Sequence, residues 1–141
     1  MSRGNLKFKV ASSILALYAT IGFGVIIFSG FEDMINLLFF FVICVLIPAY
    51  GAYGTLIKNR IAIFVSMVLF IFQAFRSVGH DSLIPHIAPI SVSFPVGNFS
   101  NGQGYLIDYF AILMALLLAW LFKIVITPNT YEPPANIDTH D

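Results

Sequence analysis

The sequence predicts an all-α membrane protein, a bundle of four transmembrane helices with an apolar extracytoplasmic loop between the third and fourth helices. Composition is the first reason: 59% of the 141 residues are hydrophobic and 10% are charged, against about 25% charged residues in a typical soluble domain. The second reason is length, because the chain accommodates roughly four spans of about 20 residues with short connections. The third is that the few charges leave long uncharged windows between them. We therefore expect one membrane domain over residues 1–127.

The first span is predicted at residues 10–30. No charge occurs between Val10 and Phe31, and an apolar run of this length crosses a bilayer as a helix. A signal peptide is the alternative, because Lys7 and Lys9 precede the run. Against it, the run is longer than the roughly 7 to 15 residues of such a segment, and the bulky Phe28 makes a poor cleavage site.

Small residues recur at every fourth position along this first span: Ser12, Ala16, Thr20 and Gly24. Helix association in lipid gains little from apolar burial, so small residues that let backbones approach matter more. The spacing predicts a packing face, either within the bundle or between copies of the chain. The alternative is that small residues are simply common in membrane helices.

The second span is predicted at residues 34–56, and its last part contains Pro48, Gly51 and Gly54. Proline removes a helical hydrogen bond and glycine lowers helix propensity. A structural kink is therefore expected near this end, with a working hinge or binding site as the alternative. Tyr50 and Tyr53 are interpreted as anchors at the membrane interface.

The third span is predicted at residues 60–79 and the fourth at residues 105–126. The uncharged part of the third span has only 15 residues and would rise about 22 Å as a helix. Flanking residues extend it, and Arg60 and Arg76 can direct their charges toward the headgroups. The fourth span ends before Pro128, since the residue preceding a proline disfavours helical geometry.

The outer loop, residues 80–104, is apolar but contains prolines and glycines that rule out a continuous helix. Within it Ile90, Val92 and Phe94 alternate with Ser91 and Ser93, which is the period of a short strand with one buried face. We expect this loop to cap the outer end of the bundle, with a possible short β-hairpin. A re-entrant loop is the alternative.

Charge placement predicts the orientation. If the chain crosses four times, six of its seven cations fall on the side of the termini and only Arg76 falls on the other side. Cytoplasmic loops retain positive charge, so both termini are expected in the cytoplasm. The six cations are Arg3, Lys7, Lys9, Lys58, Arg60 and Lys123. In length and topology the chain resembles many small bacterial inner-membrane proteins.

The tail, residues 128–141, has three prolines, three acids and no basic residue. This composition predicts a disordered cytoplasmic segment.

One polar cluster is predicted at the outer end of the spans. Gln73, Arg76 and His80 have helical spacing, Asp81 follows His80, and Asp108 lies near the start of the fourth span. Ionisable residues in spans are candidates for function. The structural interpretation is that Arg76 and Asp108 pair and pin the loop across two helices; the alternative is a site for a ligand, a proton or a partner.

Several chemistries lack the residues that they need, so we expect no enzyme, no cofactor and no metal. A thiol oxidoreductase requires a cysteine pair, whereas Cys44 is alone. No histidine occurs in a predicted span, which disfavours intramembrane serine hydrolysis and haem ligation. His80, Asp81 and His86 have no recognised metal-binding spacing.

These observations favour a non-enzymatic accessory or assembly subunit of a membrane complex. Its expected partners are the lipid bilayer and other membrane subunits or a second copy, and no nucleic acid. The alternative is a small homo-oligomeric transporter or channel, with the polar cluster at its outer mouth and the Pro48 region as an inner gate. A weaker alternative is a lipid- or quinone-binding protein in which the outer loop acts as a lid.

Overall fold

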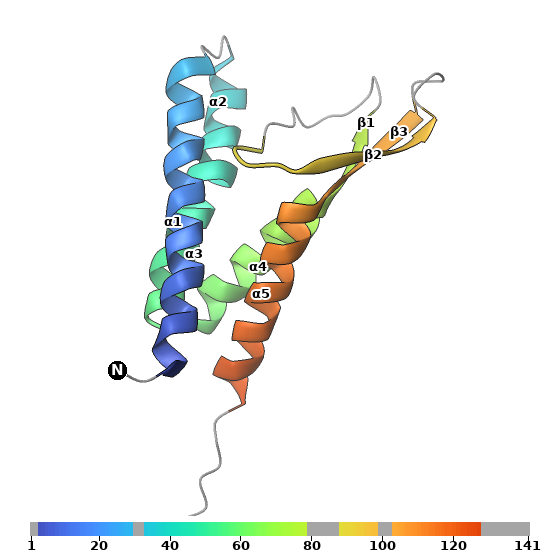
Figure 1. The fold of residues 1–141 in the computed structure, drawn as a ribbon. Coiled ribbons are helices and arrows are strands. Elements are labelled where there is room, and N and C mark those ends of the chain that lie inside the picture. The colour runs from blue at the N-terminus through green and yellow to red at the C-terminus, as the bar shows by residue number, and fades with distance from the viewer. Residues whose placement is uncertain (1–2, 30–32, 79–87, 99–102, 128–141) are drawn as a thin grey trace, which may run out of the picture.

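The computed structural model describes residues 3–29, 33–78, 88–98 and 103–127, and most of these residues are helical (Figure 1). Helix α2, a π-helical segment η1 and helix α3 follow one another without a break and form one rod. Two strands continue helices directly, β1 after α4 and β3 before α5. The elements in chain order are α1 (Arg3–Ser29), α2 (Met34–Phe41), η1 (Val42–Leu46), α3 (Ile47–Leu56), α4 (Arg60–Ala74), β1 (Phe75–Val78), β2 (Ser93–Asn98), β3 (Gln103–Asp108) and α5 (Tyr109–Ile126).

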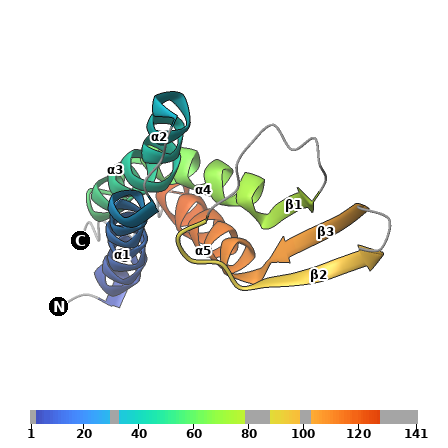
Figure 2. The ribbon, with the colours of Figure 1, turned by 90° about the horizontal axis from the view of Figure 1, so that it is seen from above.

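The two ends of the helical part differ in what they carry. The beginning of α1, the turn between α3 and α4 and the end of α5 lie together at one end (Figure 1). The strands lie at the other end and project sideways from the helices, as the view from above shows (Figure 2). We call these the basic end and the sheet end. The basic end carries Lys7, Lys9, Lys58, Arg60 and Lys123.

Three helical segments are long and apolar enough to cross a membrane: Asn5–Phe28, Met34–Leu56 and Tyr109–Ile126. Helix α4 is apolar but has only 15 residues. Helix α4 ends at Ala74, and not at residue 79 as predicted for the third span, because the chain continues as strand β1. Similarly, α5 begins at Tyr109 and not at residue 105, because residues 103–108 form strand β3.

The predicted hairpin in the outer loop is present, but later in the chain than the alternation indicated. Strand β2 begins at Ser93 and pairs antiparallel with β3, and β1 pairs with the other edge of β3, so that the order in the sheet is β1-β3-β2. Ile90 is not in a strand; it is half-buried and packs against the helical core. Pro95 is tolerated in β2 because β2 is an edge strand, where a missing N–H need not break the ladder.

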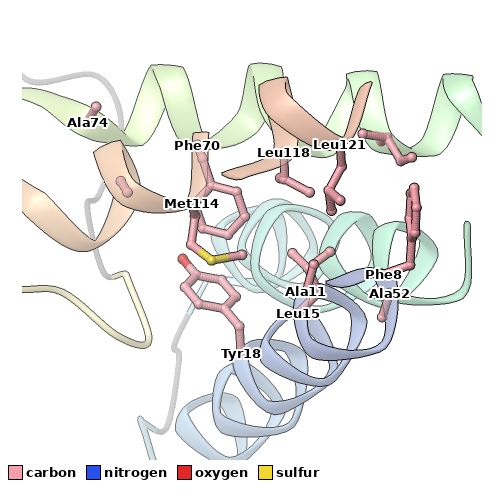
Figure 3. Packing of buried hydrophobic residues seen from close by; sticks show 12 residues of the cluster. Phe8, Ala11, Leu15, Tyr18, Ala52, Phe70, Ala74, Met114, Leu118 and Leu121 are labelled. Carbon is pink, nitrogen blue, oxygen red and sulfur yellow. The ribbon is translucent and has the colours of Figure 1, made fainter. Parts of the chain in front are cut away.

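The helical core joins α1 and α3 to α4 and α5 (Figure 3). Tyr18 of α1 lies at its centre: its ring stacks on Phe110, with the centroids 5.9 Å apart, and meets the edge of Phe70 at 5.3 Å. Aromatic pairs at these separations contribute about 0.5–1.5 kcal/mol beyond their burial. Nearer the basic end the core contains the fully buried Leu15, Leu118 and Leu121 together with the buried Phe8.

The predicted small-residue stripe of α1 does not pack as one surface within the described part of the chain. Ser12 is buried, and its hydroxyl donates to the carbonyl of Ala52 at 2.7 Å. Ala16 and Thr20 are exposed, and nothing lies within 4 Å of a Cβ built at Gly24. A contact between copies through these exposed residues stays a prediction.

The close helix approach in α1 is made by Gly22, which the stripe omits. A Cβ at Gly22 would lie 2.5 Å from the carbonyl oxygen of Cys44 in η1. Cys44 lies four residues before Pro48, and a proline has no N–H to donate to the Cys44 carbonyl. The π-helical segment Val42–Leu46 accommodates the missing donor. The backbone distortion therefore lies just before Pro48.

The other two residues assigned to the kink have a different role. Gly51 and Gly54 lie within the regular helix α3 and are buried. A Cβ at Gly51 would overlap the Oγ atom of Ser66, and one at Gly54 would overlap the Cβ atom of Ala62, both in α4. The two glycines thus allow α3 and α4 to pack closely, as small residues do in membrane helices, rather than loosen the helix.

The turn between α3 and α4 has the geometry of a helix-terminating Schellman motif. The N–H of Asn59 donates to the carbonyl of Gly54 at 2.7 Å, and the N–H of Lys58 donates to that of Thr55 at 3.2 Å. Lys58 has φ 57°, a left-handed conformation that costs a non-glycine residue about 1–2 kcal/mol. Asn59 then caps α4 by accepting from the N–H of Ile61.

Gly22 and Gly24 provide a matched pair for testing the contact between α1 and η1. Gly22→Ala is expected to lower the free energy of unfolding by about 1–3 kcal/mol, because the methyl group must displace the Cys44 carbonyl. Gly24→Ala is expected to be neutral or slightly stabilising, because its site is open. Thermal unfolding in mild detergent compares the two variants, and equal losses would contradict the assigned contact.

Candidate functional site

The predicted polar cluster does not lie on one helix face. Gln73 belongs to α4, but Arg76 lies in strand β1, where its backbone pairs with that of Leu106. Helical spacing therefore does not relate the two residues. His80 and Asp81 lie outside the described residues, as do the side chain of Arg76 and any pairing of it with Asp108.

Gln73 is a structural residue within the helical core. Its side chain is 6% exposed, and its Oε1 atom accepts a hydrogen bond from the Tyr18 hydroxyl at 2.8 Å. A buried amide or hydroxyl without a partner would cost several kcal/mol in lipid-like surroundings. The Tyr18–Gln73 bond therefore lets both polar groups occupy the core, and it ties α1 to α4.

Asp108 is also buried, with 1% of its surface exposed. It is the N-cap of α5, and its carboxylate accepts from the N–H groups of Phe110 and Ala111 at 3.0 and 3.3 Å. The same oxygen accepts from the N–H of Val92 at 3.3 Å, and the Val92 carbonyl accepts from the N–H of Tyr109 at 3.0 Å. Asp108 therefore joins three pieces of backbone: the end of β3, the start of α5 and the segment before β2.

The antiparallel register places apolar side chains together on one face of the sheet. Ile107 of β3 is paired with Phe75 of β1 and with Phe94 of β2, and Tyr105 is paired with Val96 of β2. Paired residues and residues two apart in a strand share a face. We call this set the sheet apolar face: Phe75, Phe94, Val96, Tyr105 and Ile107.

The sheet apolar face is largely uncovered in the described structure. Phe75 is 69% exposed and Tyr105 is 63% exposed, and Phe94 and Val96 are also exposed. Phe94 packs edge-on against Tyr109 at the start of α5, with the ring centroids 5.5 Å apart, so the face is held at a set angle to the helices. Local sequence pattern does not reveal this face, because β3 pairs with residues 93–98 on one side and with residues 75–78 on the other.

The outer edges of the sheet are likewise available. Strands β1 and β2 flank β3, and no further strand pairs with either of them among residues 3–29, 33–78, 88–98 and 103–127. An edge strand presents backbone N–H and carbonyl groups that can pair with another chain. The sheet end thus combines an apolar surface with backbone donors and acceptors.

Metal-binding chemistry finds no support in the described part of the chain. There, no group of three or more His, Cys, Asp or Glu side chains comes together. Cys44 is buried in η1, next to Gly22. His80, Asp81 and His86 lie outside the described residues.

Comparisons with protein-family models, curated proteins and solved structures gave no match. The class of the protein therefore rests on its own features. Three helices have the length and composition that are typical of a helical membrane protein, and a small antiparallel sheet lies at one end. Its candidate site is the sheet apolar face.

Asp108 tests how the sheet end is fixed to the helices. Asp108→Ala is expected to lower the free energy of unfolding by about 1–2 kcal/mol, because the N–H groups of α5 lose their cap. Asp108→Asn retains an oxygen acceptor of nearly the same shape and should lose much less. Unfolding of both variants in detergent measures the difference. If Asp108→Asn lost as much unfolding free energy as Asp108→Ala, the negative charge, and not the oxygen acceptor alone, would be what stabilises this end of α5.

Proposed function

We propose that the chain crosses the membrane four times, with its basic end in the cytoplasm. Five cations lie at that end, and the two acids whose side chains are described, Asp33 and Asp108, lie toward the other. Positive charge is retained on the cytoplasmic side of membrane proteins. This places both termini in the cytoplasm and the sheet on the outer side.

The short helix α4 is compatible with this topology. Fifteen residues rise about 22 Å, less than the ~30 Å of a hydrocarbon core, but strand β1 continues the chain outward. Strand β3 pairs with one edge of β1 through four residues of register, and the other edge of β1 lies at the hydrated headgroups in this proposal, because unpaired backbone groups are not tolerated in the hydrocarbon core. Strand β1 thereby extends α4 toward the outer headgroups.

The function that this geometry supports best is that of a non-catalytic accessory subunit, which docks onto another membrane protein through the sheet apolar face. The observation that carries the proposal is the exposure of this face on a sheet that is joined to α5 by side-chain contacts. Contiguous exposed apolar surface is typical of interaction sites, and Asp108 and Phe94 fix its position against α5. A partner strand could also add to β1 or β2, which is a known mode of protein recognition.

The alternative of a transporter with a polar outer mouth is less well supported. It requires Gln73 and Asp108 to face a pathway. Instead, the side-chain Oε1 atom of Gln73 accepts a hydrogen bond from the Tyr18 hydroxyl, and the Asp108 carboxylate accepts hydrogen bonds from backbone N–H groups. Both side chains are buried, so their contacts explain their presence in the spans without a transported ion.

The topology is tested by labelling single introduced cysteines in intact cells. Ser91 and Asn5 are exposed and lie at the sheet end and the basic end, respectively. A membrane-impermeant maleimide is expected to label Ser91→Cys in intact cells and Asn5→Cys only after permeabilisation. The native Cys44 is 2% exposed and sets the background. The reverse pattern would place the sheet in the cytoplasm.

Docking is tested by photo-crosslinking from the sheet apolar face. A photoreactive amino acid at Tyr105 is expected to give an adduct with a second polypeptide, whereas one at Leu113, exposed on α5, should give lipid adducts. Val96→Lys should suppress the Tyr105 adduct, because a charge opposes apolar docking, and it should leave unfolding unchanged. Lipid adducts alone at Tyr105 would show that the face rests on the bilayer, and would overturn the proposal.

A further inference from the structure

A pocket opens at the basic end, between the beginning of α1 and the end of α3. Its volume is about 390 Å³, within the range of about 300–1,000 Å³ that is usual for ligand sites. One part of its lining is apolar and the other is cationic or amide-bearing. The lining residues are Asn5, Phe8, Lys9, Leu56, Ile57 and Lys58.

The charge of the pocket favours an anion. Lys9 and Lys58 both contribute to its wall, and the Lys58 ammonium lies 5.3 Å from the centre of the Phe8 ring. Lys7 also lies at this end, with its ammonium 4.2 Å from the centre of the Trp120 ring. No carboxylate whose side chain is described lies at the basic end. Lys7 and Lys58 therefore meet aromatic rings, and not acids, in the part of the chain that the structure describes.

The apolar part of the lining indicates what kind of anion fits. Leu56 and Ile57 are about half exposed and line the same pocket as the two lysines. A free anion gains nothing from such a surface, whereas a phospholipid has a phosphate joined to apolar chains. Basic pockets between helices at the end of a membrane domain are a recurring form of lipid headgroup site.

We propose that this pocket binds the headgroup of an anionic phospholipid, with the phosphate between Lys9 and Lys58 and the first part of an acyl chain along Leu56 and Ile57. The site lies at the opposite end from the sheet apolar face, so it is independent of docking there. Lys58 has a left-handed backbone conformation, which a glycine would adopt without strain, so its side chain can be removed while the turn is kept.

The test uses three variants that each remove one positive charge from the basic end. Lys9→Gln and Lys58→Gly alter the pocket, and glycine suits the backbone at residue 58. Lys123→Gln is the control, because Lys123 is exposed near the end of α5 and does not line the pocket. The melting temperature of Lys58→Gly should equal or exceed that of the unmodified chain, which shows that the turn is retained.

Binding is measured by native mass spectrometry of the full chain in an uncharged detergent. Eight-carbon phosphatidylglycerol is the probe, and phosphatidylcholine of the same chain length and inorganic phosphate are the comparisons. Phosphatidylglycerol should bind preferentially, and its Kd should rise about tenfold in Lys9→Gln and Lys58→Gly, as expected when one charge-assisted contact is lost. Lys123→Gln should bind as the unmodified chain does.

Three results would overturn the proposal. Equal affinity for the two lipids would show that the headgroup charge is not recognised. An equal loss in all three variants would show diffuse attraction without a pocket. Displacement of phosphatidylglycerol by inorganic phosphate at similar concentrations would identify a site for a free anion in place of a lipid.

Discussion

The carboxylate of Asp108 is the point on which the arrangement of the sheet end depends. It stands where β3 becomes α5, and it accepts N–H groups from the first turn of the helix and from the segment before β2. The first turn of any helix has N–H groups without helical partners, and at α5 they are satisfied by a carboxylate that is only 1% exposed to solvent. One buried side chain thus caps the helix, ends the strand and positions the hairpin. The angle of the sheet to the helices follows from these bonds and from the packing of Phe94 on Tyr109.

The two ends of the molecule have different surface chemistry although the net charge of the chain is zero. The sheet end presents an apolar face and strand edges, whereas the basic end presents ammonium groups above aromatic rings. The helices between them carry few polar groups. The buried Ser12 and Gln73 side chains are hydrogen-bonded, whereas the buried hydroxyls of Thr55 and Ser66 have no hydrogen-bond partner within the described part of the chain. We propose the surface of the sheet end for contact with a protein and that of the basic end for contact with lipid.

Polar residues in apolar segments are natural candidates for function, and here the structure gives two of them a different explanation. Gln73 is held by Tyr18, and Asp108 is held by backbone N–H groups. Both stabilise contacts between elements that are far apart in the sequence. The same correction applies to Gly51 and Gly54, whose missing side chains make room for Ser66 and Ala62. The residue types marked these four positions as unusual for an apolar helix, and the contacts with neighbouring elements explain the role of each.

The sequence by itself determined that this is a largely helical chain with apolar helices of membrane-spanning length, because composition and the spacing of charges depend on no tertiary contact. It also indicated a hairpin in the outer loop, from local alternation and turn residues. Only the tertiary structure decided that residues 75–78 and 103–108 are strands, because each obtains its hydrogen bonds from the other. Likewise, Gly22 was identified as the close contact of α1 only through the Cys44 carbonyl opposite it. The sheet apolar face could not be predicted from local pattern, since it exists only in the register of three strands drawn from separate parts of the chain.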